Sequence, residues 1–398
     1  MTPRVSAAGL LGVIALAGGL FTACRPSEPR TLKELLNQAA SLDATERGPA
    51  IEHFIAAHGG TPVIENQSKA VFLVQDRGGA TPRIVGDFNN WAAAENGQDP
   101  SVGVPTRIEG TDWSYLDASI YTNARVEYVL LFETEAIPDP KNPRTVSAFA
   151  GPRSEVRMPQ WIAQPEIDDT AEVPAGTVSG EAVPSKWLGS PRRVWFYTPP
   201  GYDSSKDWYP VLYVLDGANY VERMRTPTIL DRLIARKSIP PIVAVFVEPA
   251  ERQEEYSRNP RWRAFMATEL VPLVDKRFRT FPAPEKRVVL GSSLSAYGAV
   301  DLVVEYPAVF GLCAALAPPA QTPTVITNQA KGQQAVRAVR FFVLSGTYDS
   351  MAMGGRKLRT ALDIGTGAVT YIEVPEGHST ETFRGHIDDA LKALLPGE

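Results

Sequence analysis

The sequence contains few of the residues that bind metals or form disulfides. It has two cysteines and four histidines in 398 residues. Cys313 lies in an apolar run typical of a buried strand, and Cys24 ends a leader-like segment, so no disulfide is expected. The histidines are scattered without the spacing of metal ligands, and the sequence therefore gives no support to a metal site.

An excess of basic residues is also missing. Lysine and arginine number 40 against 45 for aspartate and glutamate, which gives a formal net charge of −5. Because a surface that binds phosphates normally needs a basic excess, nucleic acid is not expected as a partner. The sequence contains no G-x-G-x-x-G pattern and no phosphate loop, so no nucleotide or other cofactor is expected.

After the N-terminus, the sequence has no apolar stretch of about 18 residues or more that could span a membrane. Residues 1–24 combine the positive Arg4, a short apolar run and small residues before Cys24, which predicts a signal peptide and an exported protein. The sequence LFTAC resembles a bacterial lipobox, which implies an acylated Cys24 that anchors the protein to a membrane, in the periplasm or at the cell surface. The alternative is a plain secretory signal followed by an incidental cysteine.

Helices and then strands are expected in the next part of the chain. Residues 25–64 are expected to be helical, because Thr31 and Glu34 fit a capping box and leucines recur at helical spacing. Residues 65–160 contain short β-rich runs separated by glycine, asparagine and proline turns, which predicts an antiparallel β-sandwich. Its segment RIVGDFNNW resembles the signature of immunoglobulin-like early-set domains.

The sandwich contains two tryptophans, Trp91 and Trp113, whose role the sequence leaves open. They either contact carbohydrate, as in glycan-binding modules of similar sequence, or pack the sandwich while the domain shapes the mouth of a neighbouring site. We favour packing, because the resemblance lies in residues that define the fold.

The pattern changes after an acidic segment interrupted by prolines. Residues 161–185 are expected to form an exposed linker that runs into the first strand of a second domain. In residues 186–398, strands rich in valine, isoleucine and leucine alternate with helix-length segments. This alternation predicts an α/β domain with a mainly parallel sheet covered by helices.

A serine-rich turn follows one of these strands, in the sequence RVVLGSSLSAYG. A strand is expected before Ser293 and a helix after it, which is the geometry of a nucleophile elbow. In such a turn the serine hydroxyl is exposed, and the next backbone N–H, that of Leu294, helps to bind an oxyanion. Gly291 is one of the small residues that the tight turn needs, whereas Ser295 and Ala296 stand where glycines are expected.

A catalytic serine also needs a general base and a carboxylate that orients it. His378 follows a strand and a turn glycine, whereas His386 lies in the pattern of a closing helix, so His378 is the favoured base. Asp349 follows an apolar strand and is the favoured acid, with Glu376 and Asp363 as rivals. The serine, this aspartate and the histidine come in the chain order that α/β-hydrolases use.

Two further groups are candidates for contacts with a substrate. The loop after YVLDG is expected to supply a second oxyanion donor, the backbone N–H of Ala218 or of Gly217. Arg252 and Arg258 lie beside Trp262 in one short segment that would hold an acidic or aromatic ligand by charge and stacking. Nearby glutamates almost cancel the charge of this segment, so an internally paired loop is the favoured alternative.

Six segments carry a broader resemblance: VLYVLDGANY, ERQEEYSRNPRWRAF, ELVPLVDKRF, GSSLSAYG, SGTYD and EGHSTETFR. In this order they resemble the esterase D superfamily, specifically its enterobactin (enterochelin) esterase-like branch. The resemblance implies an α/β-hydrolase fold and a serine carboxylic-ester hydrolase with Ser293, Asp349 and His378 at the triad positions. It also implies a small-molecule or polysaccharide ester as substrate, such as a siderophore lactone or an acyl ester on a polysaccharide. The alternative is a surface lipoprotein that binds glycan or siderophore and carries a degenerate hydrolase domain.

Overall fold

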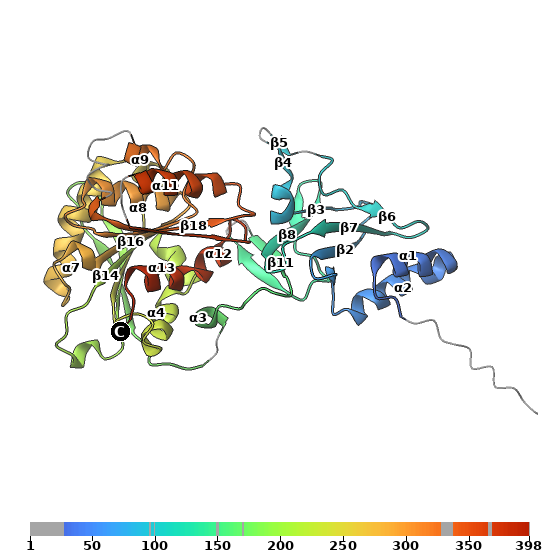
Figure 1. Cartoon of the computed structure of the whole chain (residues 1–398), viewed down its shortest axis with the longest axis horizontal. Coiled ribbons are helices and arrows are strands. Elements are labelled where there is room, and N and C mark those ends of the chain that lie inside the picture. Colours follow the sequence, from blue (N-terminus) through green and yellow to red (C-terminus); the bar gives the residue numbers. More distant parts are fainter. Residues whose placement is uncertain are drawn as a thin grey trace, which may run out of the picture.

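The computed structural model describes residues 28–94, 97–98, 100–148, 151–168, 171–327, 337–364 and 368–397. The predicted signal peptide and Cys24 lie outside these ranges. Figure 1 shows a β-rich body that follows the N-terminal helices and a larger α/β body that contains the C-terminus. In the part of the chain that the structure describes, no helix has both the length and the apolar character needed to cross a bilayer.

Two helices, α1 (Leu32–Ser41) and α2 (Ala44–Ala57), precede the first strands. The hydroxyl of Thr31 accepts a hydrogen bond from the amide of Glu34 at 3.3 Å, which caps α1 as the sequence predicts. The apolar faces of both helices pack against one sheet of the sandwich, in a cluster that contains the buried Trp113.

The β-sandwich consists, in the described residues, of two antiparallel sheets and a short ribbon. The first sheet has the order β1 (Val63–Glu65), β2 (Lys69–Gln75), β7 (Trp113–Ser119) and β6 (Thr106–Arg107). The second has the order β10 (Thr145–Ala148), β11 (Gly151–Arg157), β8 (Arg125–Phe132) and β3 (Arg83–Gly86), with β9 (Glu135–Ile137) beside β8. The ribbon pairs β4 (Ala93–Ala94) with β5 (Gly97–Gln98), and a short helix, η1 (Asp87–Ala92), follows β3. Alternate side chains of β2, β3, β8 and β11 form a shared core between the two sheets. This arrangement is consistent with the early-set sandwich that the sequence predicts.

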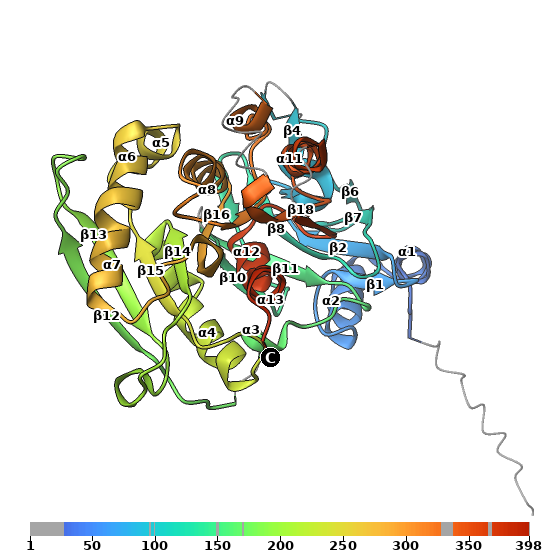
Figure 2. The same cartoon turned by 60° about the vertical axis from the view of Figure 1, so that its left-hand side comes forward.

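The larger body is built on a sheet of eight described strands. Their order is β12 (Thr177–Val183), β13 (Arg192–Thr198), β15 (Val243–Val247), β14 (Val211–Leu215), β16 (Arg287–Ser292), β17 (Leu312–Leu316), β18 (Arg340–Gly346) and β19 (Val369–Val374). The pairs from β15 to β19 are parallel, whereas β12 and β13 are antiparallel to each other, and β13 is antiparallel to β15. The mainly parallel sheet that the sequence predicts is therefore present. Figure 2 shows β12 and β13 at the edge away from the N-terminal helices.

The strand β12 changes the expected domain boundary. Thr177–Val183 falls inside the segment 161–185, which we expected to be an exposed linker entering the first strand. Instead it pairs with β13 along its whole length, from Thr177 opposite Thr198 to Val183 opposite Arg192. Only Val183 of this strand is buried. As an edge strand, β12 is held by backbone hydrogen bonds to β13 on one side, and most of its side chains remain exposed.

Helices cover both faces of this sheet. One face packs against residues of α5 (Arg252–Tyr256), α6 (Pro260–Ala264), η4 (Phe265–Leu270), α7 (Val271–Arg277), α8 (Leu294–Glu305), α9 (Thr324–Thr327) and α11 (Ala352–Ile364). The other packs against α3 (Pro165–Asp168), η3 (Asn219–Arg223), α4 (Thr226–Ala235), α12 (Thr380–Gly385) and α13 (Ile387–Leu394). Two short turns of helix complete the described elements, η2 (Tyr202–Ser204) and η5 (Pro284–Lys286). In β17, between β16 and β18, Cys313 is fully buried, and this burial raises the pKa of its thiol.

Candidate active site

Ser293 lies at a sharp turn between β16 and α8. Its backbone has φ 57° and ψ −126°, a conformation that non-glycine residues rarely adopt and that costs energy. The amide of Ser293 donates to the carbonyl of Leu316 in β17 at 2.8 Å, which ties the turn to the neighbouring strand. The strand, turn and helix follow one another as the sequence predicts for a nucleophile elbow.

The tight turn explains the residues on either side of Ser293. A side chain at Gly291 would place its Cβ 2.3 Å from the carbonyl oxygen of Ser295, so only glycine fits there. Ser295 is fully buried, and its hydroxyl accepts from the amide of Ser292 and donates to the carbonyl of Ser292, both at 2.8 Å. The serine that replaces an expected glycine therefore closes the turn with two hydrogen bonds.

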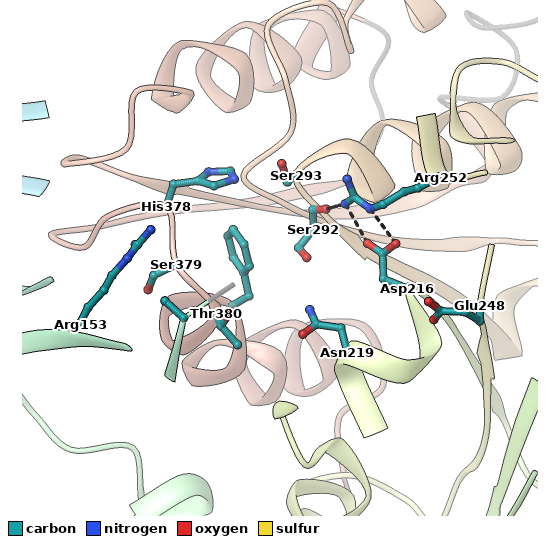
Figure 3. Close-up of a pocket in the computed structure, with 12 residues that line it drawn as sticks. Arg153, Asp216, Asn219, Glu248, Arg252, Ser292, Ser293, His378, Ser379 and Thr380 are labelled. Carbon is teal, nitrogen blue, oxygen red and sulfur yellow. Dashed lines mark hydrogen bonds and ion pairs between the residues drawn. The ribbon is translucent and has the colours of Figure 1, made fainter. Parts of the chain in front are cut away.

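His378 and Asp349 lie in the loops that follow the last two strands of the sheet. Nδ1 of His378 is 2.8 Å from Oδ2 of Asp349, whose side chain is buried. The other oxygen, Oδ1, accepts from the amide of Met351 at 2.7 Å, so both oxygens of the carboxylate are engaged. The imidazole packs edge-on against Phe383, with ring centroids 5.1 Å apart. This leaves Nε2 of His378 for a group in the pocket, and in Figure 3 the ring points toward Ser293.

The rival residues lie elsewhere. Glu376 is buried and binds Arg125 of the sandwich at 3.0 Å, and its other oxygen lies 3.6 Å from the imidazole of His386. Asp363 is half-exposed and pairs with Arg359 on the surface of α11. The structure therefore brings only Asp349, of the three candidate acids, to His378.

A pocket with a volume of about 330 Å³ opens over Ser293 and His378. Its walls are formed by Ala148, Arg153, Asp216, Asn219, Glu248, Arg252, Ser292, Ser293, His378, Ser379, Thr380 and Phe383. Ala148 and Arg153 belong to β10 and β11 of the sandwich, whereas the remaining residues belong to the α/β body. The sandwich therefore forms one side of the pocket mouth.

The polar groups of the pocket are largely paired. Arg252 donates to both oxygens of Asp216, at 2.8 and 2.9 Å. Burial alone would lower the pKa of Arg252, but the bonds to Asp216 raise it. Glu248 accepts from the amide of Ala218 at 2.7 Å, and burial raises the pKa of this carboxyl group. No group of three or more potential metal ligands occurs among the residues that the structure describes.

These contacts affect the predicted second oxyanion donor. The amide of Ala218 is held by Glu248, so it becomes free to bind an oxyanion only when that carboxylate moves away. Gly217 has a packing role, since a Cβ there would lie 2.8 Å from the backbone of Phe246 and Val247 in β15. The amide of Leu294 lies in the first turn of α8, directly after Ser293.

The arginine and tryptophan segment lies only partly in the pocket. Arg252 lines it, but Arg258 pairs with Asp301 at 3.5 Å and lies outside its walls. The expectation that Trp262 stacks on a ligand is wrong: its side chain is 1% exposed and packs against Tyr256 and Phe265 in the core. The helix α6 is too short for its buried face to be recognised from apolar periodicity.

The tryptophans of the sandwich have structural contacts. Trp113 is 1% exposed, as the packing interpretation predicts. Trp91 is half-buried, donates to Oδ1 of Asp87 at 2.8 Å and lies under the guanidinium of Arg153, 4.1 Å from its ring centroid. Because Arg153 lines the pocket and also binds Glu127 at 3.2 Å, Trp91 supports a residue of the pocket mouth.

Sequence reasoning missed three charged residues of the pocket, Asp216, Glu248 and Arg153. Glu248 follows β15 at the carboxyl end of the parallel strands, where sites of α/β sheets gather, and this position was a usable signal. Arg153 had no such signal, because it reaches the site from another domain.

A family model described as "Putative esterase" matches residues 185–389, which is more than half of the chain. The chain belongs to the putative esterase family. The match begins just after β12 and includes Ser293, Asp349 and His378, so the sandwich lies outside the part that defines this esterase family.

Curated relatives of this esterase are distant. The chain is 24% identical over 136 residues to the uncharacterized protein YbbA of Bacillus subtilis, covering 30% of this chain and 54% of the relative. It is 28% identical over 183 residues to an iron(III) enterobactin esterase of Escherichia coli, covering 44% of each chain. The matches span about half the length of these relatives.

Solved structures share the fold over most of the chain. A ferric enterobactin esterase from Salmonella typhimurium is similar with a TM-score of 0.70 and 19% identity, over 86% of this esterase and 98% of that chain. An enterobactin esterase from Shigella flexneri is similar with a TM-score of 0.68 and 20% identity, over 86% and 97%. At these identities the likeness shows the fold, with both the α/β-hydrolase body and the preceding domain included in the match.

Proposed function

We propose that the protein is a serine carboxylic-ester hydrolase in which Ser293 is the nucleophile, His378 the general base and Asp349 the residue that orients the histidine. One observation carries this proposal: a serine with left-handed backbone shares a pocket with a histidine whose Nδ1 is 2.8 Å from a buried carboxylate. Membership of the esterase family supports the same reaction class.

The proposed reaction is acyl transfer in two steps. Nε2 of His378 takes the proton of Ser293 as its Oγ attacks the ester carbonyl carbon, and the same proton then passes to the departing alcohol oxygen. Asp349 stabilises the charged imidazole between these transfers. Water, activated by the same histidine, attacks the acyl-enzyme and releases the acid and the free serine.

The negative oxygen of the intermediate needs donors that are already in place. The amide of Leu294 fits this role, because it follows the nucleophile at the start of α8. The amide of Ala218 is the second donor only if the substrate displaces the carboxylate of Glu248. Substrate binding and oxyanion stabilisation are then coupled at this wall of the pocket.

For the substrate we propose a siderophore lactone or an acyl ester on a polysaccharide. Two similar solved structures are enterobactin esterases, and a third, with a TM-score of 0.51 over 56% of this chain, is a ferulic acid esterase. The pocket offers two arginines, but each already binds a carboxylate: Arg252 binds Asp216 and Arg153 binds Glu127. A panel of catecholate lactones, feruloyl and acetyl polysaccharide esters and short aryl esters distinguishes the two classes.

Labelling by a fluorophosphonate probe tests the nucleophile, because the probe reacts only with an activated serine. We expect Ser293→Ala to lose labelling and nearly all ester hydrolysis, and Ser292→Ala, one residue away, to keep at least part of both. Adding His378→Ala to Ser293→Ala should cost little more, since the triad acts as a unit. A folded Ser293→Ala protein with wild-type activity would refute the assignment. A wild-type protein that is neither labelled nor active on any ester would favour a binding lipoprotein with a degenerate hydrolase domain.

We also propose that the protein is exported and anchored to a membrane through an acylated Cys24. The support is the signal-like segment 1–24 and its lipobox-like end. Cys24→Ser is expected to move the exported protein from the membrane fraction to the soluble fraction. Unchanged fractionation of this variant would rule out the lipid as the main attachment.

A further inference from the structure

One turn of the sandwich touches both loops that carry the proposed base and acid. It joins β7 to β8, and together with Arg125, the first residue of β8, it spans residues 120–125. Arg125 contacts the loop of His378, and Tyr121 contacts Tyr348, the residue before Asp349. Figures 1 and 2 show α12, the helix that follows the histidine loop, next to the sandwich strands β8 and β11.

One arginine of the sandwich makes several hydrogen bonds to the histidine loop. The amide of Arg125 donates to the carbonyl of Pro375 at 3.2 Å. Its guanidinium donates to Glu376 Oε2 at 3.0 Å, to Ser379 Oγ at 3.2 Å and to Thr382 Oγ1 at 2.9 Å. These partners lie on both sides of His378 in the sequence, so Arg125 fixes the loop before and after the base.

Burial makes these bonds hard to replace. Arg125 is 4% exposed, and its guanidinium also lies 3.5 Å from Glu127 and 3.3 Å from Glu155. Burial alone would raise the pKa of Glu376, but Arg125 and His386 together lower it to about 2, so Glu376 is a carboxylate at neutral pH. Since water cannot substitute for buried partners, the loop has one strongly preferred position.

The acid loop is held by the other end of the same turn. The amide of Tyr121 donates to the hydroxyl of Tyr348 at 3.0 Å, and the two rings lie 5.5 Å apart. Tyr348 also packs against the core of the sandwich. The amide of Tyr348 donates to the carbonyl of Glu376 at 3.1 Å, which joins the acid loop directly to the histidine loop.

The backbone of the histidine loop also meets the sandwich directly. A Cβ at Gly377 would lie 2.0 Å from Oδ1 of Asp87, so the residue before His378 lies flat against that carboxylate. Asp87 is itself fixed by bonds from Trp91 and from the amide of Glu127, at 2.8 and 2.7 Å. The sandwich therefore contacts the histidine loop through its backbone as well as through Arg125.

We propose that the 120–125 turn is a positioning element of the active site, with Arg125 and Tyr348 as positioning residues that hold His378 and Asp349 in register. The inference rests on the proposed function of this pair. Small displacements of reacting groups reduce the rate far more than they reduce binding. Changes in the turn should therefore alter kcat more than KM, and the α/β body depends on the sandwich for the geometry of His378 and Asp349.

Two mild substitutions in the full-length chain test the proposal. Tyr348→Phe keeps the ring but removes the acceptor of the Tyr121 amide, and Thr382→Val keeps the shape but removes one acceptor of Arg125. In the double variant we expect kcat to fall by about 3- to 30-fold with KM within about twofold of wild type. Arg125→Lys, which keeps the charge but loses the fork of donors, should retain more activity than Arg125→Met.

A control variant separates positioning from loss of stability. Phe72 is buried in the core of the sandwich, where its ring contacts those of Phe88 and Tyr128, and it makes none of the hydrogen bonds between the turn and the two loops. Phe72→Leu should therefore lower the melting temperature without lowering kcat. A second readout needs no substrate: the proton between Nδ1 of His378 and Oδ2 of Asp349 is expected to give a far-downfield proton NMR signal. We expect this signal in the wild type and in Phe72→Leu, and a broadened or lost signal in the double variant.

The two proposals fail in different ways. An unlabelled, inactive wild-type protein would contradict the proposed hydrolase, while the NMR signal would still report on positioning. The positioning role is wrong if the double variant keeps both the wild-type kcat and the downfield signal. It is also wrong if Phe72→Leu and the double variant lower the melting temperature equally and Phe72→Leu then loses as much kcat, or as much of the downfield signal, as the double variant.

Discussion

Replacing Ser295 by alanine tests the elbow most directly, because it removes the two hydrogen bonds that close the turn. The hydroxyl of Ser295 bonds the amide and the carbonyl of Ser292, both at 2.8 Å, and the residue is fully buried. Ser295→Ala deletes one oxygen and leaves the Cβ, so the packing of the turn is otherwise unchanged.

The expected cost follows from what remains in the variant. In Ser295→Ala the amide of Ser292 loses the hydroxyl that accepts its hydrogen bond. Because Ser292 is buried, water does not readily take the place of this acceptor. A buried donor left unsatisfied costs about 1–3 kcal/mol. We therefore expect the free energy of unfolding to fall by about 1–3 kcal/mol, and fluorophosphonate labelling to persist in part, since the proposed nucleophile is retained.

Urea unfolding curves measure this change, and the chain offers a matched control. Ser114 is also buried, but its hydroxyl has no hydrogen-bond partner in the described structure, so Ser114→Ala should be neutral or stabilising. If Ser295→Ala and Ser114→Ala shift the free energy of unfolding equally, the turn is not closed by this hydroxyl and the reasoning is wrong.

Three further predictions concern side chains whose role the structure defines. Trp262→Ala should lower the free energy of unfolding by about 3–5 kcal/mol and leave KM of the folded fraction unchanged, as urea curves and kinetics will show, because the ring fills the core. Burial alone would lower the pKa of His386, but Asp389 and Glu376 raise it to about 9. The charged form of His386 therefore stabilises the fold below the ordinary pKa of histidine, and this stabilisation is lost as the pH rises through about 9. Urea unfolding between about pH 6 and about pH 10 measures the loss, and His386→Gln should reduce the change in the free energy of unfolding over this range by up to about 3 kcal/mol. Trp91→Ala should reduce folded yield, and a stable variant that loses only polysaccharide binding in a pull-down assay would contradict its packing role.

The parts of the site that could be predicted from the sequence are those set by local order along the chain. Ser293 lies between an apolar strand and a helix, and Asp349 and His378 each follow a strand of a parallel sheet. Since the carboxyl ends of parallel strands meet at one edge, these three residues were expected to come together. The order of strand, turn and helix is enough to bring them to one edge.

The parts that could not be predicted depend on contacts between distant segments. Arg125 binds residues about 250 positions later in the chain, and no periodicity indicates such a pairing. The strand Thr177–Val183 is exposed at every residue but Val183, and its two valines do not form the apolar alternation that identifies a half-buried strand. The burial of Trp262 cannot be predicted, because its helix of five residues is too short for apolar periodicity to indicate a buried face.

Because the thiol of Cys313 is buried, its reaction with a thiol reagent can report on unfolding of the protein. Only the thiolate reacts with maleimides, and at this position both burial and the raised pKa suppress it. The sulfur becomes reactive when β17 separates from its neighbours, so the rate of alkylation under native conditions measures the opening of the central sheet. In a Cys24→Ser chain, a cysteine introduced at the exposed Trp208 would be the only reactive thiol of the folded protein, available for a spectroscopic label without further substitution.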